Sequence, residues 1–140
     1  MFISIESSSV SGYTGSVKKK DLFSQDTMVS GESRELVVTK SARIVLGAAP
    51  RLEAHGRSKL LNRKSISIGR GRQNGVIIAD PKVSKFHAMI TFDNKRAYLK
   101  DIGSTNGTYL NGKPLAYDKP RELHDGDIIV VGNVELTVTH

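Results

Sequence analysis

Turn-forming residues interrupt the second half of this chain every few positions. Pairs such as Asn74-Gly75, Asp80-Pro81 and Asn106-Gly107 close tight turns, because glycine and asparagine accept positive φ angles and aspartate or proline favours the start of a turn. The stretches between them are short, apolar and often β-branched, and none keeps a 3.6-residue period for three turns. This spacing predicts an all-β sandwich or barrel without a substantial helix.

The expected strands share a short pattern of alternating apolar and polar residues. In residues 86–92, for example, the alternation places Phe86, Ala88, Ile90 and Phe92 on one side of a strand. The expected strands are residues 51–55, 59–61, 65–68, 76–78, 86–92, 98–101, 108–110, 128–131 and 134–138.

The beginning of the chain differs from the rest. Residues 1–33 are rich in serine and glycine, contain the run Lys18-Lys19-Lys20 and hold few large apolar residues, so we expect a flexible N-terminal arm. Residues 34–49 could supply one or two extra strands or a linker. Residues 50–140 then form the single folded domain that a chain of 140 residues allows.

Composition excludes several classes of protein. The chain has no cysteine, which rules out disulfides and zinc–thiolate sites. It has no apolar run long enough for a transmembrane helix and no signal-peptide pattern, so we expect an intracellular protein, in the cytoplasm or the nucleus. The net charge of +7 favours an anionic partner without identifying it.

Cationic, hydroxyl and amide side chains lie on three of the expected turns. Arg70 follows an alternating strand, and a guanidinium offers a fork of donors that matches phosphate oxygens. Ser84 adds a hydroxyl and Lys85 a point charge, while Thr105 and Asn106 supply a hydroxyl and an amide from another turn. A phosphorylated threonine carries a charge of about −1.5 to −2 and three acceptor oxygens, which these groups could satisfy without a metal.

His87 is predicted to be structural rather than a ligand-binding residue. On a strand that begins at Phe86 it would face away from Phe86, and its ring could tie one loop to the next by hydrogen bonds. The four histidines of the chain show no metal-ligand spacing, so no metal is expected.

Four short motifs follow one another along the chain: Gly69-Arg70, Ser84-Lys85-Phe86-His87, Ser104-Thr105-Asn106-Gly107-Thr108 and Asn111-Gly112. Taken together, these motifs resemble the forkhead-associated (FHA) domain family over about residues 50–140. The ending Leu123-His-Asp-Gly-Asp127-Ile-Ile-Val-Val131-Gly also resembles the end of that domain.

The resemblance implies a β-sandwich of about eleven strands that binds phosphothreonine peptides through loops at one end. Arg70 and Ser84 would bind the phosphate, Lys85 and Thr105 would assist, and Asn106 would hold the peptide backbone. The remaining motif residues would shape the loops; these are Gly69, His87, Gly107, Asn111 and Gly112.

Preference beyond the phosphothreonine is a separate hypothesis. Lys82 lies two residues before Ser84, and Lys82 or Arg72 could pair with an acidic side chain of the peptide. A solvated surface lysine is the alternative interpretation of Lys82.

Three other functions are alternatives to this prediction. A nucleic-acid-binding basic β-domain fits the charge, but 8 Phe and Tyr residues without Trp offer no stacking platform. Ser84, His87 and Asp101 are triad residue types, but the chain lacks a Gly-x-Ser-x-Gly elbow, so we expect no enzyme. A phosphorylated Thr14 or Thr27 in the arm could also regulate the domain's own site.

The expected partner is therefore a threonine-phosphorylated protein in a signalling interaction. We expect no small-molecule substrate, no cofactor and no membrane contact, and we do not expect nucleic acid as a direct ligand.

Overall fold

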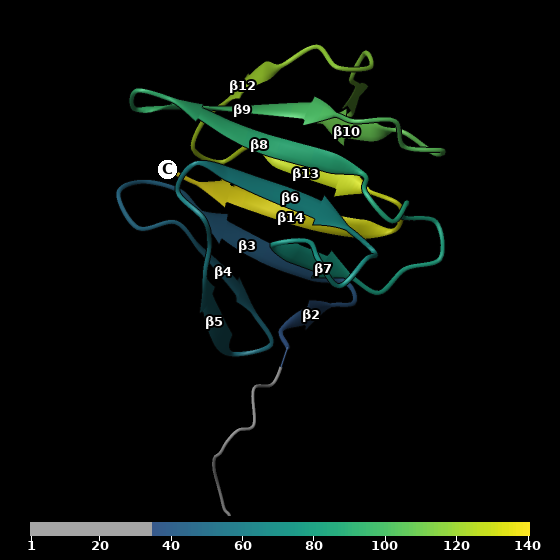
Figure 1. Cartoon of the computed structure of the whole chain (residues 1–140), viewed down its shortest axis with the longest axis horizontal. Helices are drawn as coiled ribbons and strands as arrows, with labels where there is room; N and C mark the ends of the chain where they lie inside the picture. The colour runs from purple at the N-terminus through teal and green to yellow at the C-terminus, as the bar shows by residue number, and fades with distance from the viewer. Residues whose placement is uncertain (1–34) are drawn as a thin grey trace, which may run out of the picture. The chain divides into compact units, whose positions relative to one another are not determined.

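Two β-sheets make up the part of the chain that the computed structural model describes, residues 35–140 (Figure 1). One sheet has seven strands in the order β11-β10-β13-β14-β3-β4-β5, and the other has six in the order β12-β9-β8-β6-β7-β2. The strands are β2 (Val37–Val38), β3 (Ser41–Val45), β4 (Arg51–Ala54), β5 (Arg57–Leu60), β6 (Ser65–Gly69), β7 (Val76–Ile78), β8 (Ala88–Asp93), β9 (Arg96–Asp101), β10 (Thr108–Leu110), β11 (Lys113–Pro114), β12 (Arg121–Leu123), β13 (Ile128–Val131) and β14 (Val134–Thr139). The arm predicted for residues 1–33, with Thr14 and Thr27, lies outside the described residues.

The predicted β-sandwich is confirmed, and its strands bury the side chains that the alternation selects. In β8, Ala88 and Ile90 are buried, and in β9 so are Ala97 and Leu99. Inward side chains from both sheets form one aliphatic core, because a strand presents every second residue to the same face. Within residues 35–140 no helix is present that could span a membrane.

Residues 35–46 contribute two strands, and one of them is central. β3 lies between β14 and β4 in the seven-stranded sheet, and its pairing with β14 is parallel. β7 also pairs in parallel with β6 and with β2. Parallel pairs join segments that no hairpin turn connects, so the turn signals of the sequence could not predict them.

The prediction that Phe86 starts a strand, on the same side as Ala88 and Ile90, is wrong. β8 begins at Ala88, and 47% of Phe86 is exposed while His87 is fully buried. The carbonyls of Ser84 and Lys85 accept hydrogen bonds from the backbone of Arg70 and Gly71, at 2.9 and 3.1 Å. These bonds hold the residues before Ala88 in a loop, so the strand alternation does not extend back to Phe86.

Three loops gather where β6, β7 and β9 end. They are residues 70–75, 79–87 and 102–107, and they lie at the side of Figure 1 to which the arrowheads of β6 and β9 point. The strands thereby bring together motif residues that are up to 37 positions apart in sequence, from Arg70 to Gly107.

Candidate functional site

The first two loops lie directly against each other at Gly69. A Cβ atom at Gly69 would stand 2.3 Å from the carbonyl oxygen of Lys85, which is closer than two such atoms can approach. Only glycine therefore permits this contact, and it brings Arg70 beside the residues that follow Val83. The Nε of Arg70 donates to the carbonyl of Val83 at 3.0 Å, which orients an exposed guanidinium along the loop.

His87 connects the second loop with the third. The backbone N–H of Ser84 donates to Nδ1 at 3.0 Å, so Nδ1 is an acceptor and Nε2 carries the ring proton. Nε2 then donates to the carbonyl of Gly107 at 2.9 Å. The fully buried ring thus fixes the positions of Ser84 and Gly107 relative to each other.

Ser84, Thr105 and Asn106 meet on the exposed side of this connection. The backbone N–H of Thr105 donates to Oγ of Ser84 at 3.0 Å, and Nδ2 of Asn106 donates to the carbonyl of Lys82 at 2.8 Å. These predicted site residues therefore lie within one hydrogen bond of the 79–87 loop. Thr105 and Asn106 are exposed and Ser84 is half-buried, so a ligand can reach all three.

Lys85 joins the site from the same loop. Its carbonyl is held by Gly71 and by Nδ2 of Asn74, at 3.1 and 2.7 Å, while its exposed Nζ lies 5.9 Å from the centroid of the Phe86 ring. This backbone anchoring leaves the ammonium group at the surface beside the aromatic ring.

A buried carboxylate shapes the third loop. Asp101 Oδ1 accepts the backbone N–H groups of Gly103 and Ser104 at 2.8 and 3.0 Å, and Oδ2 accepts the hydroxyls of Ser104 and Thr108. Burial alone would raise the pKa of Asp101, but the hydrogen bonds from Ser104, Gly103 and Thr108 hold it below the usual value. Gly107 closes the loop with a φ of 88°, and its N–H donates to Oγ of Ser104.

A second carboxylate holds the 79–87 loop. Asp80 accepts the N–H of Lys82 at 2.8 Å and, from the turn between β13 and β14, the N–H of Asn133 at 3.0 Å. The N–H of Lys82 does most to lower the pKa of Asp80, burial opposes this effect, and Asn133 lowers the pKa further. The charged form of Asp80 is therefore the one that ties this loop to the seven-stranded sheet.

The two predicted specificity residues lie on different loops. Lys82 is exposed, and its backbone connects Asp80 with Asn106. Arg72 is exposed on the 70–75 loop. Both side chains are thus accessible near the residues described above.

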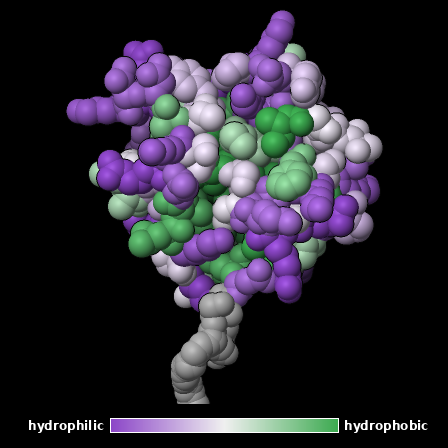
Figure 2. Space-filling view, viewed as in Figure 1, coloured by the Kyte–Doolittle hydropathy of each residue, from purple (hydrophilic) through white to green (hydrophobic). Residues whose placement is uncertain are grey.

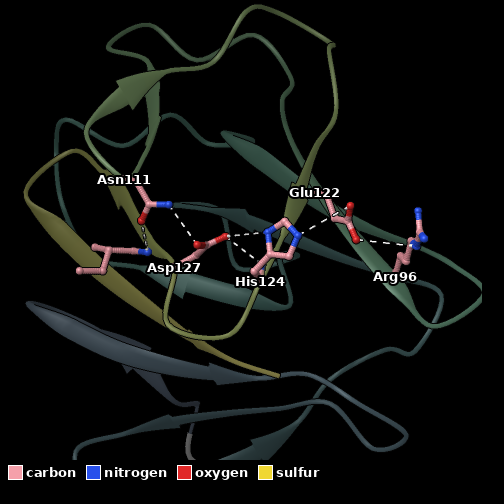
Figure 3. Close-up of polar contacts among 6 residues, drawn as sticks. Arg96, Asn111, Glu122, His124 and Asp127 are labelled. Atoms are coloured by element: carbon pink, nitrogen blue, oxygen red, sulfur yellow. Dashed lines mark hydrogen bonds and ion pairs between the residues drawn. The ribbon is translucent and has the colours of Figure 1, made fainter.

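Asn111 and Gly112 lie away from the three loops. They form the turn between β10 and β11, where both residues have positive φ angles, and Asn111 is bonded to Asp127 and to the N–H of Ile128, each at 3.0 Å (Figure 3). In the same figure His124 stands between Asp127 and Glu122, and Glu122 faces Arg96. This part of the motif therefore joins two turns and contacts none of the predicted phosphate ligands.

The sequence reasoning missed the side chains that position the loops. The sequence presents Asp80 and Asn74 only as turn residues and Asp101 only as a triad residue type, yet all three are buried and accept or donate hydrogen bonds within the loops. An aspartate at the start of a turn is the available signal, because its side chain can accept the backbone N–H two residues further on, as Asp80 and Asp101 do. Among the described residues no group of histidines, cysteines or carboxylates could hold a metal ion.

Comparison with known proteins identifies this arrangement. The family model described as the FHA domain matches residues 66–132. FhaA, an FHA domain-containing protein of Mycobacterium tuberculosis, is 37% identical over 86 residues, which are 61% of this chain but only 16% of FhaA.

Two solved structures are similar to this chain in both fold and sequence. One comes from a structural and functional analysis of phosphothreonine-dependent FHA domain interactions, with a TM-score of 0.52 and 38% identity over 59% of this chain and 82% of that one. The other is the FhaA FHA domain complexed with the intracellular domain of Rv3910, with a TM-score of 0.52 and 38% identity over 58% of this chain and 86% of that one. Because this chain covers more than four fifths of each of these domains, and because the family model falls on the strands and loops that build the site, the chain belongs to the FHA domain family.

Proposed function

We propose that this chain binds a phosphothreonine-containing segment of a partner protein and so mediates a phosphorylation-dependent interaction in signalling. The observation that carries the proposal is the convergence of Arg70, Ser84 and Thr105 from three separate loops onto one accessible surface. The proposal also draws on the FHA domain of phosphothreonine-dependent interactions that this chain resembles at 38% identity.

The phosphate would lie between Arg70 and Ser84. The Nε–H of Arg70 is used by Val83, and the terminal nitrogens of the guanidinium remain for charge-assisted bonds to phosphate oxygens. The Ser84 hydroxyl accepts from Thr105, so its own proton is directed to another acceptor. Lys85 and the Thr105 hydroxyl would add charge and a further donor.

Asn106 would hold the backbone of the bound peptide. Its Nδ2 is bonded to the carbonyl of Lys82, which fixes the plane of the amide. The amide oxygen and the second N–H then lie on an exposed side chain, and an extended peptide offers both a donor and an acceptor at each residue.

Lys82 or Arg72 would add a preference for an acidic residue in the peptide. Both are exposed cations on loops that carry the proposed phosphate ligands. Because exposed ion pairs contribute about 1 kcal/mol or less, the preference should be modest.

FHA domains are non-catalytic interaction modules, and we propose that this chain is not an enzyme. Both ring nitrogens of His87 form hydrogen bonds to the backbone: Nδ1 accepts the N–H of Ser84, and Nε2 donates to the carbonyl of Gly107. The ring therefore cannot act as a base for the Ser84 hydroxyl. A binding affinity in the micromolar range is expected, because a short peptide must offset the loss of its own conformational freedom.

The test compares Arg70→Ala with Arg63→Ala as bait for proteins in cell lysate, with and without phosphatase treatment. Arg63 is an exposed arginine between β5 and β6, so its variant loses the same charge outside the three loops. We expect phosphatase-sensitive capture by the wild type and by Arg63→Ala, and none by Arg70→Ala. Equal capture by all three proteins, or capture that survives phosphatase, would overturn the proposed function.

A further inference from the structure

The exposed aromatic side chains of the described chain all lie beside the three loops. Figure 2 shows a largely hydrophilic surface on the viewed face, in which apolar side chains reach solvent in patches. Within residues 35–140 the large apolar side chains that are strongly exposed are Leu60, Phe86, Tyr109, Tyr117 and Ile128. Both aliphatic members lie away from the loops, at the end of β5 and the start of β13, whereas each aromatic member neighbours a loop residue.

Tyr117 covers the start of the 102–107 loop. It forms an isolated parallel bridge with Asp101, and a Cβ at Gly103 would lie 3.7 Å from its ring. The residue is 70% exposed, so one part of its side chain packs against the loop and the rest meets solvent.

Tyr109 covers the end of the same loop. A Cβ at Gly107 would lie 3.5 Å from its ring, and the residue projects from the same face of the sheet as its partners Pro114 and Val130. Tyr109 is 38% exposed. Gly103 and Gly107 are each two residues from Thr105, so the two tyrosines stand at both sides of the residues proposed to contact the peptide.

Phe86 is the exposed aromatic residue of the 79–87 loop. It is two residues from Ser84, is 47% exposed, and its ring contacts the ammonium group of Lys85. We refer to Phe86, Tyr109 and Tyr117 as the aromatic rim.

We propose that the aromatic rim binds apolar side chains that flank the phosphothreonine, so that the preferred ligand has an anionic centre and apolar residues on its sides. The inference rests on the proposed function and names the class of peptide that the same site takes. An extended peptide advances about 3.3 Å per residue, so side chains two or three residues from the phosphothreonine lie within about 10 Å of it. Phe86 is two residues from Ser84, and the two tyrosine rings lie beside Gly103 and Gly107, each of which is two residues from Thr105.

The chemistry of the rim supports an apolar occupant. Aromatic residues are enriched at protein interfaces because they bury a large area with few rotatable bonds. Removing apolar surface from water is favourable, so a ligand that covers these three exposed rings gains binding free energy. Arg70 and Lys85 would therefore bind the phosphate of the peptide, and the aromatic rim would bind its apolar side chains.

The experiment uses a phosphothreonine peptide library with all flanking positions randomised, bound to the full chain. Four proteins are compared: the wild type, Tyr109→Ser, Tyr117→Ser, and Leu60→Ser as a matched control. Leu60 is 75% exposed, about as much as Tyr117, but lies on the edge strand β5 away from the loops. The best peptide is then measured by calorimetry against a version with glycine in place of its apolar residues.

We expect the wild type and Leu60→Ser to select apolar flanking residues. At least one tyrosine variant should lose that selection and bind the best peptide about tenfold more weakly, while its affinity for the glycine version is unchanged. If all four proteins show phosphate-dependent binding without apolar selection, the inference is wrong and the proposed function stands. If no protein binds in a phosphate-dependent manner, the proposed function fails as well. The same four proteins are also titrated with a single-stranded oligonucleotide. If the tyrosine variants lose only this binding, the rim serves nucleic acid and the inference is overturned.

Discussion

The buried side chains between the two sheets differ in chemistry from those beneath the loops. The core between the sheets is aliphatic throughout. Within residues 35–140 the buried polar side chains are Asn74, Asp80, His87, Asp101 and Thr108, and each of them lies in or next to one of the three loops. One region is therefore held by apolar contact and the other by hydrogen bonds.

The apolar core stabilises the sandwich, whereas the polar side chains position the loops. Apolar contacts are non-directional, so the core can stabilise the sandwich without fixing where each loop atom lies. Hydrogen bonds have narrow limits of distance and angle, so Asp80, His87 and Asp101 fix particular N–H and carbonyl groups. The polar region thereby positions Arg70, Ser84 and Thr105 before any ligand binds.

The largest effect on stability is expected in the apolar region. Ile90→Ala removes a fully buried side chain from β8 and should lower the free energy of unfolding by about 4 kcal/mol. Urea denaturation measures the change, with Leu60→Ala at an exposed position as the control that changes it by less than about 0.5 kcal/mol. Peptide affinity of the remaining folded Ile90→Ala protein should be unchanged, and a large loss of affinity would contradict the separation.

His87→Ala should lower both stability and binding. The change leaves the N–H of Ser84 and the carbonyl of Gly107 without their partner and opens a cavity, at a cost of about 3 kcal/mol. Binding should weaken even where the variant is fully folded, because Ser84 and the 102–107 loop are no longer held together. An affinity equal to that of the wild type under such conditions would show that the ring does not position the site.

Asp101→Asn should have a smaller effect that depends on pH. Replacing one carboxylate oxygen by an amide N–H places donors against donors and should cost about 2 kcal/mol at neutral pH. The pKa of Asp101 is lowered in the folded protein, so its stabilisation is complete above the unfolded value of about 3.9 and is lost as pH falls below it.

Urea midpoints from pH 7 to pH 3 test this dependence. The difference in stability between the wild type and Asp101→Asn should stay constant down to about pH 5 and shrink below about pH 4. A difference that grows as the pH falls would have the wrong sign for a carboxylate with a lowered pKa.

The smallest effect is expected at the surface contacts of Figure 3. The imidazole of His124 lies 3.8 Å from Glu122 and 3.9 Å from Asp127 and is largely exposed, so His124→Ala should change stability by less than about 0.5 kcal/mol. Its backbone N–H still donates to Asp127 in the variant. A loss of more than about 1 kcal/mol in urea denaturation would mean that polar contacts outside the three loops also support the fold.

The sequence predicted the apolar region better than the polar one, for physical reasons. Alternation along a strand is local, so segments such as β8 and β9 could be recognised from their own residues, although the start of β8 was misplaced. The parallel pairing of β3 with β14 and the contact between Asp80 and Asn133 join residues far apart in sequence, and no local pattern encodes them. The roles proposed for Arg70, Ser84 and Asn106 rest on their donor groups and on the resemblance to the FHA family, because no local pattern shows which turns meet in space.

Amide hydrogen exchange of the unliganded protein tests the central claim most directly. If the polar contacts hold the loops in place without ligand, the amides of Ser84 and Thr105, bonded to His87 and Ser84, should exchange at least about a hundredfold more slowly than in an unstructured chain. Exchange of these two amides at the unstructured rate, while the strand amides of β8 and β9 stay protected, would contradict the claim.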